Sequence, residues 1–178
     1  ALDPRAKNYT HREIADERLD YWLKPEKEAE INFDIRFGWT AAPYFINSYR
    51  SGESEVVDEL HRQGIAVGFF FFERAAAVSP EAAEALDRTI IADFRGMLSE
   101  TAPGAASVVG EAFSERRCYV EVMLWDSDRV FEAVQNWSSQ ASNVRAAAFR
   151  SYRRPAGILF FNSSERSRNA CYAGAIAD

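Results

Sequence analysis

The sequence predicts an α+β fold with a ferredoxin-like split βαβ core over residues about 65–162. A mainly antiparallel sheet is expected, extended by an added N-terminal strand and helices. Two observations carry this prediction. Residues 65–73 place bulky apolar groups on both sides of a strand, which is the pattern of a strand covered on both faces. From residue 65 the predicted order is strand, helix, strand, strand, helix with an extra helix, strand, and this order matches the ferredoxin-like motif.

A helical arm is predicted for residues 1–30. The segment from Thr10 to Glu13 has the form of a capping box, and apolar residues then recur at approximately helical spacing. A helix over about 11–23 is therefore expected, and Pro25 ends it.

Strict alternation of apolar and polar residues over 31–39 predicts a strand with one apolar face. After it, Thr40 is expected to cap a helical segment that runs through Tyr49. A second short helix follows, and Gly64 closes it. These elements lengthen the sheet or cover one side of it.

The longest predicted helix runs from residue 79 to about 101. Ser79 is an N-cap residue, Pro80 suits the first helical position, and Glu81 lies near the positive end of the helix dipole. Apolar residues continue at three-to-four spacing until a Pro-Gly pair at 103–104 terminates the pattern.

Two strands, about 106–113 and 117–125, are predicted to form a hairpin around the turn at 114–116. The next segment begins with N-cap residues at 126–128 and predicts a helix. An alanine-rich helix is then expected over about 143–152.

The C-terminal part contains a last short strand over 157–161 and a surface tail over 163–178. A length of 178 residues, a hydrophobic fraction of 47% and no internal repeat are consistent with one globular domain over residues 1–178. The 13 Phe, 7 Tyr and 4 Trp residues should dominate its core.

The overall charge argues against nucleic acid as the partner. The net charge is −6 and the pI is about 5.1, whereas affinity for phosphate backbones comes from Lys and Arg. No apolar stretch reaches the roughly 18–20 residues of a membrane-spanning helix. With only Cys118 and Cys171, no disulfide framework is expected. A cytoplasmic protein without a membrane segment is predicted, and a removed leader stays open.

Asn-x-Ser/Thr triplets occur at Asn8, Asn136 and Asn162, and the sequence favours their chance occurrence.

No catalytic, metal or cofactor site is predicted. His11 and His61 lack metal-ligand spacing and are expected to face solvent, and Cys118 is expected to be a buried structural thiol. The fingerprints of phosphate loops, dinucleotide sites and nucleophile elbows are missing from the sequence. Four strand carboxylates would either form an acid-base group or occupy polar positions at the solvent-exposed edge of a sheet, and the second interpretation is favoured. They are Asp34, Glu73, Glu111 and Glu121.

A cluster of arginines near aromatic residues is the candidate binding site. Guanidinium groups beside aromatics bind carboxylates or phosphates in a bidentate manner, while the alternative is a solvated helix face. The leading hypothesis is a non-enzymatic protein-binding domain, immunity or inhibitor-like, that neutralises or regulates a partner protein. The formation of a homodimer is a further possibility. The candidate residues are Arg145, Arg150, Tyr152, Arg153 and Arg154.

The alternative hypothesis is a small-molecule-binding enzyme or carrier, in which the ferredoxin-like sheet and its helices enclose an aromatic-lined pocket. Its wall would consist of Phe69, Phe71, Tyr119 and Trp125.

Overall fold

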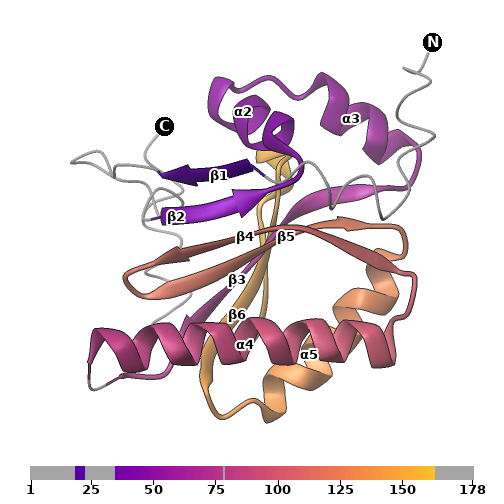
Figure 1. Ribbon diagram of the computed structural model, residues 1–178. Helices are drawn as coiled ribbons and strands as arrows, with labels where there is room; N and C mark the ends of the chain where they lie inside the picture. The colour runs from indigo at the N-terminus through magenta and orange to yellow at the C-terminus, as the bar shows by residue number, and fades with distance from the viewer. Residues whose placement is uncertain (1–18, 23–34, 78, 163–178) are drawn as a thin grey trace.

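A computed structural model describes residues 19–22, 35–77 and 79–162, which form an α+β fold (Figure 1). Within these ranges seven strands form one antiparallel sheet in the order β1-β2-β4-β5-β3-β6-β7. The strands are β1 (Leu19–Trp22), β2 (Ile35–Thr40), β3 (Ala66–Arg74), β4 (Ala106–Ser114), β5 (Arg117–Leu124), β6 (Val144–Ser151) and β7 (Ile158–Asn162). The helices in the same ranges are α2 (Pro43–Ser51), α3 (Glu55–Arg62), α4 (Pro80–Thr101), α5 (Ser127–Gln140) and the short 3-10 helix η2 (Arg154–Ala156).

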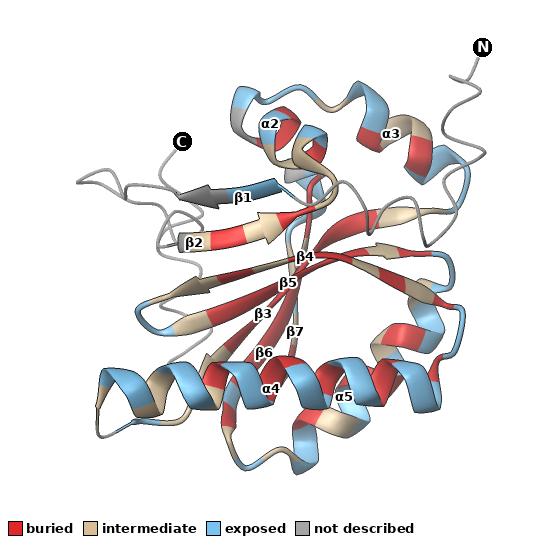
Figure 2. Ribbon diagram, in the orientation of Figure 1, coloured by how far each residue is buried: buried red, intermediate tan, exposed pale blue. Residues whose placement is uncertain are grey.

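The phenylalanine-rich segment is the strand β3, and it lies inside the sheet between β5 and β6. Its four consecutive phenylalanines, residues 69–72, are at most 6% exposed. Figure 2 shows buried residues along β3 and its neighbours, with helices on both sides of the sheet. The prediction of a central strand covered on both faces is confirmed.

One face of the sheet is covered by α4 and α5, which pack against strands β3 to β7 (Figure 1). Phe70 and Phe72 point into this layer and contact Phe94 of α4 with ring centroids 5.0 Å apart. The predicted start of α4 is confirmed, because the Ser79 side chain accepts a hydrogen bond from the Ala82 N–H at 3.2 Å. None of the helices in the described ranges is long and apolar enough to cross a membrane.

The opposite face lies beneath α2 and α3 (Figure 1). Here Phe69 and Phe71 join an apolar cluster with Phe45 and Tyr49 of α2 and with Tyr152, which follows β6. As predicted, a glycine follows the end of α3: Gly64 has φ +79°, a left-handed conformation that residues with a side chain rarely adopt.

The alanine-rich helix predicted over 143–152 is wrong, since residues 144–151 form the strand β6. The alanines themselves explain the difference. Ala147 and Ala148 pair with Phe72 and Phe71 of β3, and both are fully buried. Small side chains at these positions leave room for the large rings of the central strand, so packing overrides helix propensity.

The helix predicted over 11–23 is also wrong in the part that is described. Residues 19–22 form the strand β1, which pairs with β2. Of the predicted arm, only residues 19–22 are described. Residues 31–34 of the predicted strand and the tail at 163–178 also lie outside the described ranges.

The capping role predicted for Thr40 is corrected as well. The N-cap residue of α2 is Ala42, and no side chain caps the helix. The Thr40 hydroxyl instead accepts a hydrogen bond from the Ala42 N–H at 2.9 Å and donates one to Glu121 at 2.7 Å. The β4–β5 hairpin, the helix α5 and the last strand β7 agree with the sequence prediction.

Candidate functional site

The five residues of the predicted arginine cluster lie in different environments on and just after β6. Arg145 is 59% exposed, with its Nη1 atom 3.7 Å from Oε1 of Glu73. Arg153 pairs through Nε with Oδ1 of Asp58 at 2.6 Å. Tyr152 is only 4% exposed and belongs to the core. Arg154 opens η2, and its side chain is outside what the structure describes.

Arg150 differs from the other members of the cluster. It lies on β6 opposite Phe69 of β3 and Ile158 of β7, so its side chain projects on the α2 side of the sheet. Its guanidinium carbon is 5.5 Å from the centre of the Tyr49 ring. In the described part of the chain, its Nε atom is shielded from solvent and has no hydrogen-bond partner.

This arrangement suits the binding of an anionic group. Withdrawing a guanidinium N–H from water without an acceptor costs about 1–3 kcal/mol or more, since the group is charged. Because the Nε atom has no exposed surface in this conformation, a carboxylate of another molecule would reach it only after a shift of the Arg150 side chain, and it would then form a charge-assisted, bidentate hydrogen bond. Tyr49 holds the planar guanidinium in place by a cation–π contact.

Three of the four residues predicted to line an aromatic pocket are buried, and the Tyr119 ring contacts the rings of the other two. Phe69, Phe71 and Tyr119 are 6%, 1% and 1% exposed. The Tyr119 ring lies 5.9 Å from that of Phe69 and 6.3 Å from that of Phe71. Trp125 lies beyond the end of β5 and is 43% exposed. None of these four residues lines the pocket that opens beside α4.

The three candidate acid-base carboxylates that the structure describes have separate partners. Glu73 lies near Arg145, and Glu111 forms an ion pair with Arg95 of α4 at 2.6 Å. Glu121 is 4% exposed and accepts a hydrogen bond from Thr40. Asp34 is outside the described ranges.

Buried Glu121 also explains a glycine in the neighbouring strand. A Cβ atom at Gly110 would lie 2.6 Å from Oε2 of Glu121. The same Cβ atom would lie 2.7 Å from the backbone oxygen of Trp39, which cannot move away as a side chain can, so glycine is needed at this position.

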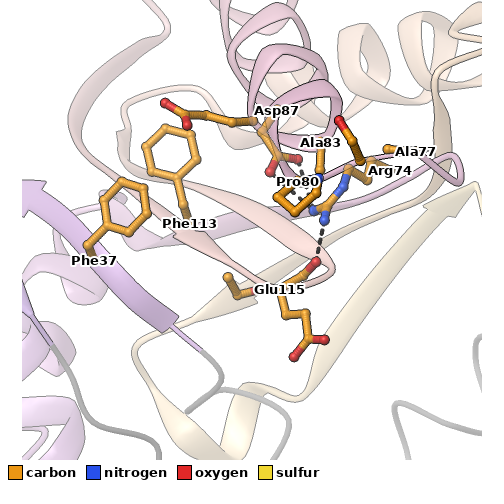
Figure 3. A pocket seen from close by; sticks show the side chains of 11 residues that line it. Phe37, Arg74, Ala77, Pro80, Ala83, Asp87, Phe113 and Glu115 are labelled. Carbon is orange, nitrogen blue, oxygen red and sulfur yellow. Dashed lines mark hydrogen bonds and ion pairs between the residues drawn. The ribbon is translucent and has the colours of Figure 1, made fainter.

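A pocket of about 570 Å³ opens between the first turns of α4 and the tip of the β4–β5 hairpin (Figure 3). We call it the α4–hairpin pocket. Its wall comes from three segments that are distant in the sequence, namely β2, the end of β3 with α4, and the hairpin, so no sequence pattern marks it. It is lined by Phe37, Arg74, Ala77, Ser79, Pro80, Ala83, Glu84, Asp87, Phe113, Ser114 and Glu115.

A nearly buried ion pair forms the inner wall of the α4–hairpin pocket. The side chains of Arg74 and Asp87 are 12% and 4% exposed. Nη1 of Arg74 donates to Oδ2 and Oδ1 of Asp87 at 3.1 and 3.3 Å, and Nη2 donates to the Glu115 carbonyl (Figure 3). Both terminal nitrogens of Arg74 are thus engaged within the protein.

Burial raises the pKa of Asp87, although Arg74 and a hydrogen bond with the Cys118 side chain partly oppose the rise. Burial and the charge of Asp87 also raise the pKa of the Cys118 thiol well above its usual range. Cys118 is fully buried, as the sequence predicts, and a thiol with such a pKa stays protonated near neutral pH.

The raised pKa of Asp87 predicts a pH dependence of stability. An unfolded aspartate ionises near pH 3.8, whereas Asp87 in the native state holds its proton to higher pH. The contribution of Asp87 to the free energy of unfolding therefore falls as pH rises from the unfolded to the native pKa, and is constant above it. Urea unfolding from about pH 3 to about pH 8 checks this for the native protein and Asp87→Asn. The free energy of unfolding of the native protein minus that of Asp87→Asn should decrease as pH rises. A difference that grows with pH would contradict a raised pKa for Asp87.

The remaining candidates from the sequence lie apart from both sites. His61 is exposed on α3, as predicted, while His11 and Cys171 are outside the described ranges. Among the residues that the structure describes, no group of three or more His, Cys, Asp or Glu side chains is arranged to hold a metal ion.

The fold and the sites define an α+β domain with a half-buried arginine on one face and a pocket beside α4 on the other. Comparisons with protein-family models, curated proteins and solved structures found no match for this chain.

Proposed function

We propose that this chain is a non-enzymatic protein-binding domain that neutralises or regulates a partner protein, and that Arg150 binds a carboxylate of this partner. The observation that supports the proposal is the guanidinium of Arg150, stacked over Tyr49 with its Nε shielded from water and lacking an acceptor. A guanidinium donor without an acceptor is stabilised when a carboxylate on another molecule accepts its hydrogen bond.

The helices that cover this face of the sheet also present apolar side chains to solvent. Two exposed apolar side chains lie on the helices that cover this face, Tyr44 on α2 at 51% exposure and Val56 on α3 at 40%. Tyrosine and arginine are the residue types enriched at the energetic centres of interfaces. Arg153, 48% exposed and paired with Asp58, adds a polar contact at the end of β6.

The proposal includes a ferredoxin-like core formed by β3, α4, β4, β5, α5 and β6. Its support is the strand order, in which β5 lies between β3 and β4 and β6 flanks β3 on the other side. All these neighbours are antiparallel. In this arrangement β1 and β2 extend the sheet beyond β4, and β7 extends it beyond β6.

The experiment is affinity capture from a lysate of the source organism, with the native chain and Arg150→Ala as baits. We expect the native chain to retain one protein in a stoichiometric amount, and Arg150→Ala to lose most of it. Truncating one partner of a buried charge-assisted pair at an interface costs about 2–5 kcal/mol, which lowers affinity by roughly thirtyfold or more.

Arg145→Ala is the matched control, because it removes a guanidinium from the same strand whose side chain already lies near Glu73 and is largely exposed. This variant should capture the partner as well as the native chain does. If no protein is retained in a stoichiometric amount, or if both alanine variants retain it equally, the proposal is wrong.

A further inference from the structure

We propose that the α4–hairpin pocket binds a small aromatic molecule without net charge. The proposal is independent of the proposed function, because this pocket lies on the α4 side of the sheet and Arg150 projects on the α2 side. A ligand here would give the same domain a second binding activity.

The size and the apolar part of the wall suit a small ring compound. Pockets that enclose small ligands usually have about 300–1,000 Å³, and this one has about 570 Å³. Phe37 and Phe113 line one side, and Pro80 and Ala83 of α4 line another (Figure 3). Apolar side chains from elements that are distant in the sequence thus meet around one space.

The two phenylalanine rings of the wall favour an aromatic ligand. Phe37 and Phe113 stack with ring centroids 5.0 Å apart and an interplanar angle of 20°. Both residues are half-buried, so the described part of the chain leaves some surface of each uncovered. Aromatic rings prefer stacked or edge-to-face contacts with further rings, and such a contact adds to the gain from apolar burial. An aromatic ligand is therefore favoured over an aliphatic one of the same size.

The charged residues of the wall already interact within the protein. Arg74 donates to Asp87 at 3.1 Å and also to the Glu115 carbonyl. Oε1 of Glu84 accepts from Arg88 of the same helix, with Nη2 at 2.7 Å and Nε at 3.1 Å. Glu115 makes a further interaction of its own. Each charged residue of the wall thus has a partner before any ligand enters.

This pairing favours a ligand without charge. A charged group that enters the pocket loses part of its hydration, and it regains this cost only where an opposite charge is available. An anion would have to displace Asp87 from Arg74. A cation would have to displace Arg74 from Asp87 or Arg88 from Glu84. A neutral ring has no such cost.

The hydroxyl groups of the wall and the start of α4 do not change this preference. Ser79 Oγ accepts from the Ala82 N–H at 3.2 Å. Ser114 Oγ donates to the Arg117 carbonyl at 3.1 Å and accepts from the Arg117 N–H at 3.0 Å. The N–H groups at the start of a helix can attract an anion. Glu81 already provides one, since a hydrogen bond to its own backbone holds its pKa below the usual range.

The test is a titration followed by protein-observed NMR, with three ligands that share one skeleton. They are neutral 3-phenylpropanamide, anionic 3-phenylpropanoate and cationic 3-phenylpropylamine. We expect the amide to cause saturable shifts at the residues of the α4–hairpin pocket. Both charged ligands should bind at least about tenfold more weakly, because the paired wall does not offset their loss of hydration. The Arg150→Ala variant should bind the amide as the native chain does, which separates this test from that of the proposed function.

A first pair of variants tests the place of binding. Ala83→Trp puts a large side chain into the pocket and should abolish the shifts. Ala85→Trp is the matched control, because Ala85 is exposed on the same helix and does not line the pocket. Circular dichroism of both variants checks that they are folded.

A second pair of variants tests the aromatic wall. Phe113→Leu keeps an apolar side chain but removes the ring, and it should weaken binding of the amide about two- to tenfold. Phe131→Leu is the matched control, because Phe131 is also half-buried, lies on α5 and is absent from the lining. This control should leave the affinity unchanged.

Three results would overturn the inference. The first is that either charged ligand binds as tightly as the amide. The second is that the two variants of either pair bind the amide equally well. The third is that the amide causes no saturable shifts, or causes them outside the pocket.

Discussion

Phe70→Ala is expected to lower the free energy of unfolding by about 3–5 kcal/mol. Phe70 is fully buried in the central strand β3. Its ring centroid lies 5.0 Å from those of both Phe94 of α4 and Phe149 of β6, so it joins the sheet to its helical layer. Truncation removes these contacts and leaves a cavity that rigid neighbours on several elements cannot close. Urea unfolding followed by circular dichroism measures the effect.

Tyr44→Ala is the control for this measurement, because Tyr44 is 51% exposed on α2 and its truncation should cost little. A loss below about 1 kcal/mol for Phe70→Ala would mean that the ring is not enclosed as described, and the packing of β3 between two covered faces would have to be abandoned.

Arg74→Met is expected to lower the free energy of unfolding by about 3 kcal/mol. The substitution keeps much of the apolar stem and leaves the carboxyl of Asp87, 4% exposed, without its cation. Its pKa should then rise further, since burial already raises it and Arg74 opposes the rise. The loss of stability should therefore be larger at neutral pH than at acidic pH, where the Asp87 carboxyl is protonated in both the folded and the unfolded state.

The double variant Arg74→Met with Asp87→Leu distinguishes a charge effect from a packing effect. Replacing both members of a buried pair by apolar groups is often close to neutral, so the double variant should recover most of the stability that Arg74→Met loses. Urea unfolding of the three proteins gives the comparison. If the double variant were as unstable as the single one, loss of packing and not the uncompensated carboxylate would explain the effect.

The parts of the fold that the sequence predicted are those with strong local signals. Ser79 and Pro80 define the start of α4 because capping depends on neighbouring residues only. The run of phenylalanines at 69–72 predicted a strand covered on both faces because no other strand position tolerates such bulk on both sides.

The strand β6 could not be predicted from its own residues. An alanine-rich stretch has high helix propensity, and only its pairing with Phe71 and Phe72 explains why alanines occur there. The error extended to the candidate site. Arginines expected on one helix lie instead on a strand and beyond its end, where strand alternation separates Arg145 and Arg150.

The α4–hairpin pocket could not be predicted from the sequence either, because it too depends on tertiary structure. Arg74 and Asp87 are thirteen positions apart, and the rings that face them, Phe37 and Phe113, come from two other strands. No spacing rule joins these residues, because the sheet order that brings them together is a tertiary property. The local sequence signal near this pocket was the well-defined N-terminus of α4, which comes shortly after a strand that ends in a charged residue.

The hydrogen-bonding state of Arg150 can be measured by the ¹H–¹⁵N NMR signal of its Nε–H group, which is assigned by its loss in Arg150→Lys. In the isolated protein we expect the proton without the downfield shift that a hydrogen bond to a carboxylate causes, and we expect that shift to develop when the captured partner is added. A strongly downfield proton in the isolated chain would show that the guanidinium already has an anionic acceptor. Arg150 would then be a structural residue without a free donor for a partner's carboxylate.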